Sequence, residues 1–80
     1  MIIRQEPLVI IVNENEMRIS LEDNYISGEV SLYNLKGFLI KRKSIDTNVC
    51  VFDVTSFTPG IYIVVLSKAT NFKIRKVIIP

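Results

Sequence analysis

Hydrophobic residues recur at every second position over short runs of this chain, and this period restricts the possible folds more than any other feature. Met17, Ile19 and Leu21 share one face of an extended segment, and the residues between them are polar. A two-residue period places side chains on alternate sides of a β-strand. One apolar and one polar face are typical of an antiparallel sheet that meets solvent on one side.

Seven short runs show this alternation or continuous apolar character, with turn signals between them. They are Leu8–Val12, Glu16–Leu21, Gly28–Asn34, Phe38–Lys43, Asn48–Val54, Gly60–Ser67 and Phe72–Ile79. The sixth run is apolar on both faces, so we expect a central strand there. The first run is either a second central strand or an edge that pairs with another chain. This spacing predicts an all-β fold, and we expect an antiparallel β-sandwich of about seven short strands.

Turn residues punctuate the runs. Gly37, after Tyr33–Lys36, predicts a hairpin with a bulge, and Pro59 followed by Gly60 has the order of a type II turn. Both glycines are therefore expected at positive φ. We expect Tyr62 to pack in the core with its hydroxyl bonded back to the turn, as in a tyrosine corner. Three further connections are expected to close hairpins: Asn13–Asn15, Asp46–Asn48 and Lys68–Asn71.

The composition excludes several kinds of function. We treat residues 1–80 as one domain, and its hydrophobic content of 49% argues against disorder. The single cysteine precludes an internal disulfide, and the chain has no histidine, the commonest zinc ligand. The carboxylates are scattered, and no glycine-rich phosphate loop is present. We therefore expect no enzyme, no catalytic residue, no metal or cofactor, and no small-molecule substrate.

Cys50 shares a strand face with Phe52 and Val54 in the sequence pattern. We expect a buried thiol that behaves as a small apolar group, with no basic group adjacent to lower its pKa. An intermolecular disulfide in an oxidising compartment is the alternative.

Charge is distributed unevenly along the chain. Up to Leu35 there are two basic and six acidic residues, a net charge of −4; from Lys36 onward there are eight basic and two acidic residues, a net charge of +6. This asymmetry marks either an electropositive partner surface or solvated outer strand faces. Aromatic residues are sparse around the run Lys41–Lys43, so we interpret it as a solvated strand end and expect no nucleic acid partner.

Two segments of the chain resemble a known family. One reads Gly-Glu-Val-Ser-Leu-Tyr-Asn-Leu-Lys-Gly-Phe-Leu-Ile from Gly28, and the other reads Phe-Asp-Val-Thr-Ser-Phe-Thr-Pro-Gly-Ile-Tyr-Ile-Val from Phe52, before Lys76-Val-Ile-Ile. Over about residues 16–79, the pattern resembles the type A C-terminal sorting domain of the type IX secretion system. The matching positions are Val30, Leu32, Tyr33, Gly37, Asp53, Val54, Phe57, Gly60, Tyr62 and Lys76.

The resemblance implies an immunoglobulin-like sandwich and a non-catalytic sorting or anchoring function. Such a domain is recognised by an outer-membrane translocon and is usually removed by a sortase-like peptidase. The implied location is secreted or at the cell surface of a Bacteroidetes-type bacterium, as part of a longer precursor; residues 1–7 lack the pattern of a signal peptide. The terminal strand is then the natural signal element, with Lys73, Arg75 and Lys76 as candidate recognition residues.

Other functions fit some of the same residues. An immunoglobulin-like module for adhesion or assembly would use an exposed strand edge, for example in a homodimer joined through Leu8–Val12. Nucleic-acid binding through the basic half would give an affinity that falls steeply with salt. The basic residues of the last strand would also protect an edge from unwanted pairing.

Overall fold

The computed structural model describes residues 8–21 and 23–80. Its strands are β1 (Val9–Val12), β2 (Glu16–Ser20), β3 (Glu29–Asn34), β4 (Leu39–Ser44), β5 (Val49–Asp53), β6 (Gly60–Lys68) and β7 (Asn71–Ile79). All seven predicted strands are confirmed, and each boundary lies within one residue of the expected one. A single 3₁₀ turn, η1 (Asp23–Tyr25), precedes β3. In the two described ranges, no helix has the length and apolar character needed to cross a membrane.

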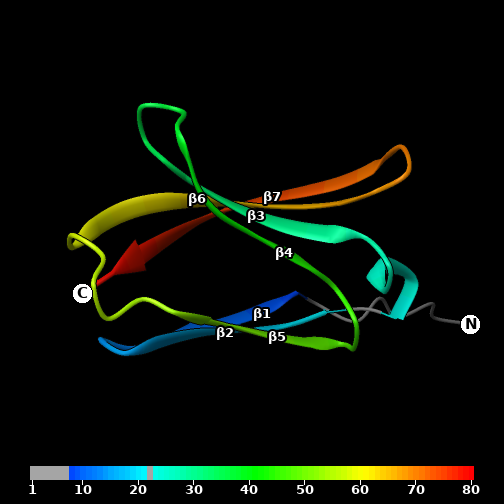
Figure 1. The fold of residues 1–80 in the computed structure, drawn as a ribbon, viewed down its shortest axis with the longest axis horizontal. Coiled ribbons are helices and arrows are strands. Elements are labelled where there is room, and N and C mark those ends of the chain that lie inside the picture. Colours follow the sequence, from blue (N-terminus) through cyan, green and yellow to red (C-terminus); the bar gives the residue numbers. More distant parts are fainter. Residues whose placement is uncertain (1–7, 22) are drawn as a thin grey trace, which may run out of the picture.

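The strands form two antiparallel sheets that stack face to face (Figure 1). One has three strands in the order β1-β2-β5, and the other has four in the order β4-β3-β6-β7. The predicted all-β sandwich is therefore confirmed. Strand β6, which is apolar on both faces, lies between β3 and β7 and is therefore a central strand, as expected. Strand β1 is instead at the edge of its sheet.

The hydrophobic core fills the space between the two sheets. Met17, Ile19, Leu32, Val64 and Leu66 are all fully buried in it. These side chains come from alternate positions of β2, β3 and β6, so the two-residue period of the sequence becomes the inner faces of the sandwich. Each such burial stabilises the fold by about 1.5–3 kcal/mol. The core thus holds the outer faces and edges of the sheets in fixed positions.

Asp46–Asn48 does not close a hairpin, so that prediction is wrong. The segment carries the chain from one sheet to the other, because β4 pairs with β3 and β5 pairs with β2. Ile45, immediately before it, is buried in the core, and the Leu21 amide donates a 2.9 Å hydrogen bond to the Asn48 carbonyl. A short polar turn looks the same in the sequence whether its strands pair or separate.

The β3–β4 hairpin forms as predicted, with Gly37 at φ 90°. The side-chain Oδ1 of Asn34 accepts hydrogen bonds from the amides of Lys36 and Phe38, each 3.0 Å long. An irregularity in the β3–β4 register makes Ile40 the extra residue of β4. The hairpin projects away from the sandwich at the upper left of Figure 1.

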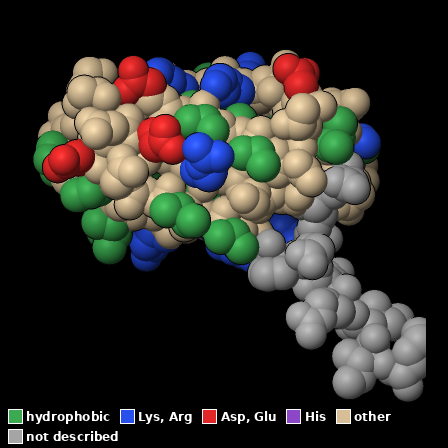
Figure 2. Space-filling view, turned by 90° about the horizontal axis from the view of Figure 1, so that it is seen from below, with side chains coloured by type: hydrophobic (Ala, Val, Ile, Leu, Met, Phe, Trp, Pro, Cys, Tyr) green, Lys and Arg blue, Asp and Glu red, His purple; other side chains and the backbone are tan. Residues whose placement is uncertain are grey.

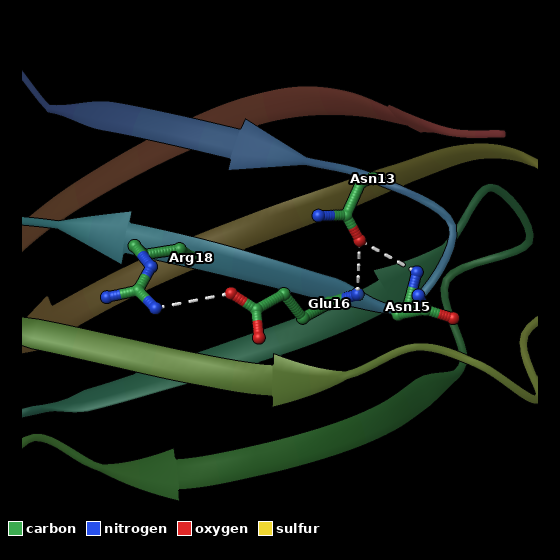
Figure 3. Close-up of polar contacts among 4 residues, drawn as sticks. All are labelled: Asn13, Asn15, Glu16 and Arg18. Carbon is green, nitrogen blue, oxygen red and sulfur yellow. Dashed lines mark hydrogen bonds and ion pairs between the residues drawn. The ribbon is translucent and has the colours of Figure 1, made fainter.

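A side-chain-capped turn also joins β1 to β2, which confirms the hairpin predicted at Asn13–Asn15. Asn13 Oδ1 accepts hydrogen bonds from the amides of Asn15 and Glu16, both 2.8 Å long (Figure 3). This bond pattern lets an asparagine side chain replace part of a backbone turn. Beside it, Arg18 forms an exposed ion pair with Glu16 at 3.3 Å.

Candidate recognition surface

Asp53 lies at the end of β5, near the start of the second motif segment. Its Oδ1 accepts a 3.0 Å hydrogen bond from the Thr55 amide. Hydrogen bonds from the side chain and backbone of Thr55, helped by the nearby Lys41 amine, hold the pKa of the Asp53 carboxyl below its usual range. The carboxylate therefore fixes the start of the crossing from β5 to β6.

Tyr62 lies near the end of the same motif segment and near the start of β6. Its hydroxyl donates a 2.6 Å hydrogen bond to the Thr58 carbonyl, which confirms the predicted bond back to the turn. Its ring lies 5.5 Å from that of Phe57, between centroids. Gly60 has positive φ as expected, but its φ of 149° is far from the roughly +80° of a type II turn. The expected type II turn is therefore not formed. At this point the chain crosses from the sheet of β5 to the sheet of β6.

The remaining motif positions are distributed over the fold. Val30 and Leu32 are fully buried in the core, and Gly37 lies in the β3–β4 turn. Tyr33 lies half-buried on the outer face, paired with Ile63. Most residues that carry the family resemblance are thus occupied in holding the strands and turns together.

Gly28 is a structural residue that the sequence analysis missed. A Cβ atom at this position would lie 2.2 Å from the carbonyl oxygen of Ser67 and 2.9 Å from Cβ of Lys68. Only glycine allows the chain entering β3 to approach the end of β6 this closely. The sequence signal was present, because Gly28 opens the first motif segment.

The basic run of β4 is exposed, in agreement with its interpretation as a solvated strand end, but its lysines also contact the edge of β5. Lys41 Nζ donates a 3.1 Å hydrogen bond to the carbonyl of Asp53. Lys43 Nζ donates to the carbonyl of Val51 and lies 5.4 Å from the ring centroid of Phe52. Both lysines leave from the inner face of β4, and folding brings that face over β5.

The β6–β7 hairpin presents a group of exposed apolar side chains on one face. Phe72, Ile74 and Ile78 are 64%, 60% and 69% exposed. They lie on the outer face of the four-stranded sheet, because their odd-numbered neighbours Val77 and Ile79 face the core. Pairing of β7 with β6 extends this apolar face across the hairpin.

The same hairpin carries charge of one sign only. Residues 54–80 contain four charged side chains, all basic: Lys68, Lys73, Arg75 and Lys76. Lys76 lies on the outer face between Ile74 and Ile78, whereas Arg75 lies on the opposite face. The turn between the two strands, drawn in orange in Figure 1, rises away from the three-stranded sheet. The structure thus places the three predicted recognition residues on one edge strand.

A family model described as a secretion system C-terminal sorting domain matches residues 13–80. The chain belongs to the type IX sorting domain family. Searches of curated proteins and of solved structures found no match. Membership makes this domain a sorting signal, and it implies a secreted or cell-surface precursor of a Bacteroidetes-type bacterium. It also points to a non-catalytic role and to a protein of the secretion machinery as partner.

The opposite face of the sorting domain has a different character. Figure 2 shows the outer face of the three-stranded sheet, where acidic and basic side chains lie close together among scattered apolar ones. The ion pair between Glu16 and Arg18 belongs to this face. Its charges are therefore mixed, in contrast to the purely basic hairpin.

The sorting domain buries its thiol. Burial raises the pKa of Cys50, and the positive charge of Lys43 opposes this rise only in part. The expectation of a buried cysteine is confirmed, but the expectation that no basic group is near it is wrong, because folding brings β4 to β5. Among residues 8–21 and 23–80, no group of three or more potential metal ligands comes together.

Proposed function

We propose that an outer-membrane translocon of the type IX system recognises this domain in its folded form, through the outer face and edge of the β6–β7 hairpin. The observation that carries this proposal is the difference in burial between the motif side chains and those of the hairpin. Most motif side chains are engaged in the core and turns, whereas Phe72, Ile74 and Ile78 face solvent. A sortase-like peptidase that removes the domain after export is the second partner we propose.

The chemistry of the hairpin supports a protein partner. Contiguous exposed apolar side chains are uncommon on a domain that has no partner. The four cations around them attract an acidic surface and accelerate encounter with it. A partner with an apolar centre and acidic rim would complement this hairpin.

The test is surface display of a reporter protein that carries this domain at its C-terminus in a type IX-competent bacterium. The test variant Ile74→Ser/Lys76→Glu/Ile78→Ser changes only exposed side chains of the hairpin. We expect display to fall by about tenfold or more, because both the apolar contact and the charge attraction are lost.

A matched control changes the same kinds of side chain on the opposite face. The variant Val9→Ser/Ile11→Ser/Arg18→Glu alters two exposed apolar residues and one exposed cation of the three-stranded sheet. We expect it to be displayed like the unmodified domain. Normal display of the hairpin variant, or equal loss in both variants, would refute recognition through the hairpin.

Self-assembly through β1 is a second candidate, favoured by its position at a sheet edge and by the 59% exposure of Ile11. Sizing chromatography over a range of concentrations tests it. A dimer that is lost in Ile11→Lys would support assembly. A monomer at all concentrations would exclude it.

A further inference from the structure

β7 offers a long and regular open edge. It has nine residues and lies at the end of the four-stranded sheet, and β6 is its only sheet neighbour among the described residues. The β6–β7 register is uninterrupted: it begins with Gly60 paired with Ile79 and ends with Lys68 paired with Asn71. No bulge therefore twists this edge away from another strand, as bulges often do on protected edges.

The hairpin register determines which backbone groups point to that edge. Lys68 and Asn71 pair across a two-residue turn, with Ala69 at φ 54°. The residues that flank such a turn exchange backbone hydrogen bonds, and bonded and non-bonded pairs then alternate along the strands. The odd-numbered residues of β7 therefore bond to β6. The even-numbered residues, which are Phe72, Ile74, Lys76 and Ile78, direct their N–H and C=O groups outward.

The other edge strands of the sandwich are shorter than β7, and each differs from it in a further respect. β4, at the opposite end of the four-stranded sheet, has six residues and an irregular register with β3. The carbonyls of Val51 and Asp53, on the edge strand β5, accept hydrogen bonds from the two lysines of β4. β1 is an edge strand of only four residues. Among the strands in the described part of the chain, β7 alone combines length, regular register and exposed apolar side chains next to its outward backbone groups.

We propose that the partner adds an extended strand to the open edge of β7. This inference rests on the function proposed above. Backbone bonds would form with the even-numbered residues of β7, as in other cases of strand addition. The added strand is acidic and apolar: it places a carboxylate beside Lys76 on the outer face and another beside Arg75 on the opposite face. Apolar side chains beside Ile74 and Ile78 continue the outer face.

A second copy of this chain is a poor occupant of the same edge. Antiparallel pairing of two β7 strands about their centres would place Arg75 opposite Arg75. Parallel in-register pairing would place each cation beside its own equivalent. Like charges in such positions destabilise a strand pair. A different, acidic chain is therefore the favoured occupant.

Proline substitution separates strand addition from side-chain recognition. Ile74→Pro removes one outward N–H, whereas Ile74→Ala removes the same side chain and keeps that N–H. Proline is tolerated on an edge strand where its nitrogen faces away from the sheet. We expect reporter display to fall about tenfold further in Ile74→Pro than in Ile74→Ala. The pair Lys76→Pro and Lys76→Ala repeats the comparison, and thermal unfolding of each purified variant checks its fold.

The outcomes distinguish this inference from the proposed function. If the hairpin surface variant loses display but the folded proline variants match their alanine partners, strand addition is overturned and hairpin recognition stands. If all these variants are displayed normally, both proposals fail. Binding to vesicles of phosphatidylglycerol that is lost in Lys76→Glu, but not in Ile74→Pro, would assign the edge to lipid and overturn the inference.

Hydrogen exchange of the unmodified domain tests the premise even if a proline variant does not fold. We expect the amides of residues 72, 74, 76 and 78 to exchange about 100-fold faster than those of residues 73, 75 and 77. Equal protection of both sets would mean that the edge is already covered, which would overturn the proposal.

Discussion

Gly28 shows how one missing side chain permits the close approach of two strands. Because a Cβ there would lie 2.2 Å from the Ser67 carbonyl oxygen, Gly28→Ala must push β3 away from β6. We expect the free energy of unfolding to fall by about 1–3 kcal/mol, measured by urea denaturation. Gly37→Asn is the control, since its position has open space and asparagine tolerates positive φ. Unchanged stability of Gly28→Ala would contradict this steric explanation.

Cys50 gives the domain a defined pH dependence. Its pKa is raised in the fold, so the neutral thiol is favoured there. The resulting stability is fully present below the pKa of the unfolded thiol and is lost as the pH rises through the higher pKa of the folded state. We expect the unmodified domain to lose more stability than Cys50→Ala between neutral pH and about pH 10. Parallel denaturation curves at several pH values measure this difference, and equal losses would contradict it.

At the scale of elements, β4 stabilises the edge of β5 through its lysines. Lys43→Ala removes both the hydrogen bond to the Val51 carbonyl and the cation over the Phe52 ring. We expect a loss of about 1 kcal/mol in the free energy of unfolding. Arg42→Ala is the matched control, because Arg42 forms an exposed 3.8 Å ion pair with Glu29, and such a pair contributes little energy. Equal losses in the two variants would argue against edge coverage.

The seven strands were predictable because alternation is a local property. Met17 and Ile19, for example, show their shared face in the sequence alone. The partners of the strands were less accessible, as the wrong hairpin at Asp46–Asn48 demonstrates. The chain crosses to the other sheet at that point and buries Ile45 there, and this depends on contacts among segments far apart in the chain.

At the scale of the whole molecule, sorting should depend on the fold. Phe52→Ala removes a fully buried ring from the core, with an expected cost of about 3–5 kcal/mol. That is comparable to the roughly 4–12 kcal/mol expected for the total stability of a domain of this size. We expect the reporter to lose surface display although every side chain of the hairpin is intact.

A lower growth temperature provides the control for this variant. Display of Phe52→Ala should recover partly at a lower growth temperature if the fold is restored there, and circular dichroism of the purified domain reports the folded fraction. Full display of a domain that lacks cooperative unfolding would show that a linear segment, and not a folded surface, is the signal.

The sequence by itself determined the secondary structure, the likeness to sorting domains and the basic character of the last strand. Side-chain direction along an extended chain is fixed locally, so it can be read from residue order. Only the tertiary structure decided that Lys41 and Lys43 cover β5, that Gly28 meets Ser67, and that β7 ends a sheet. These features arise because many strand pairings are nearly equal in local energy, and burial of one shared core selects among them.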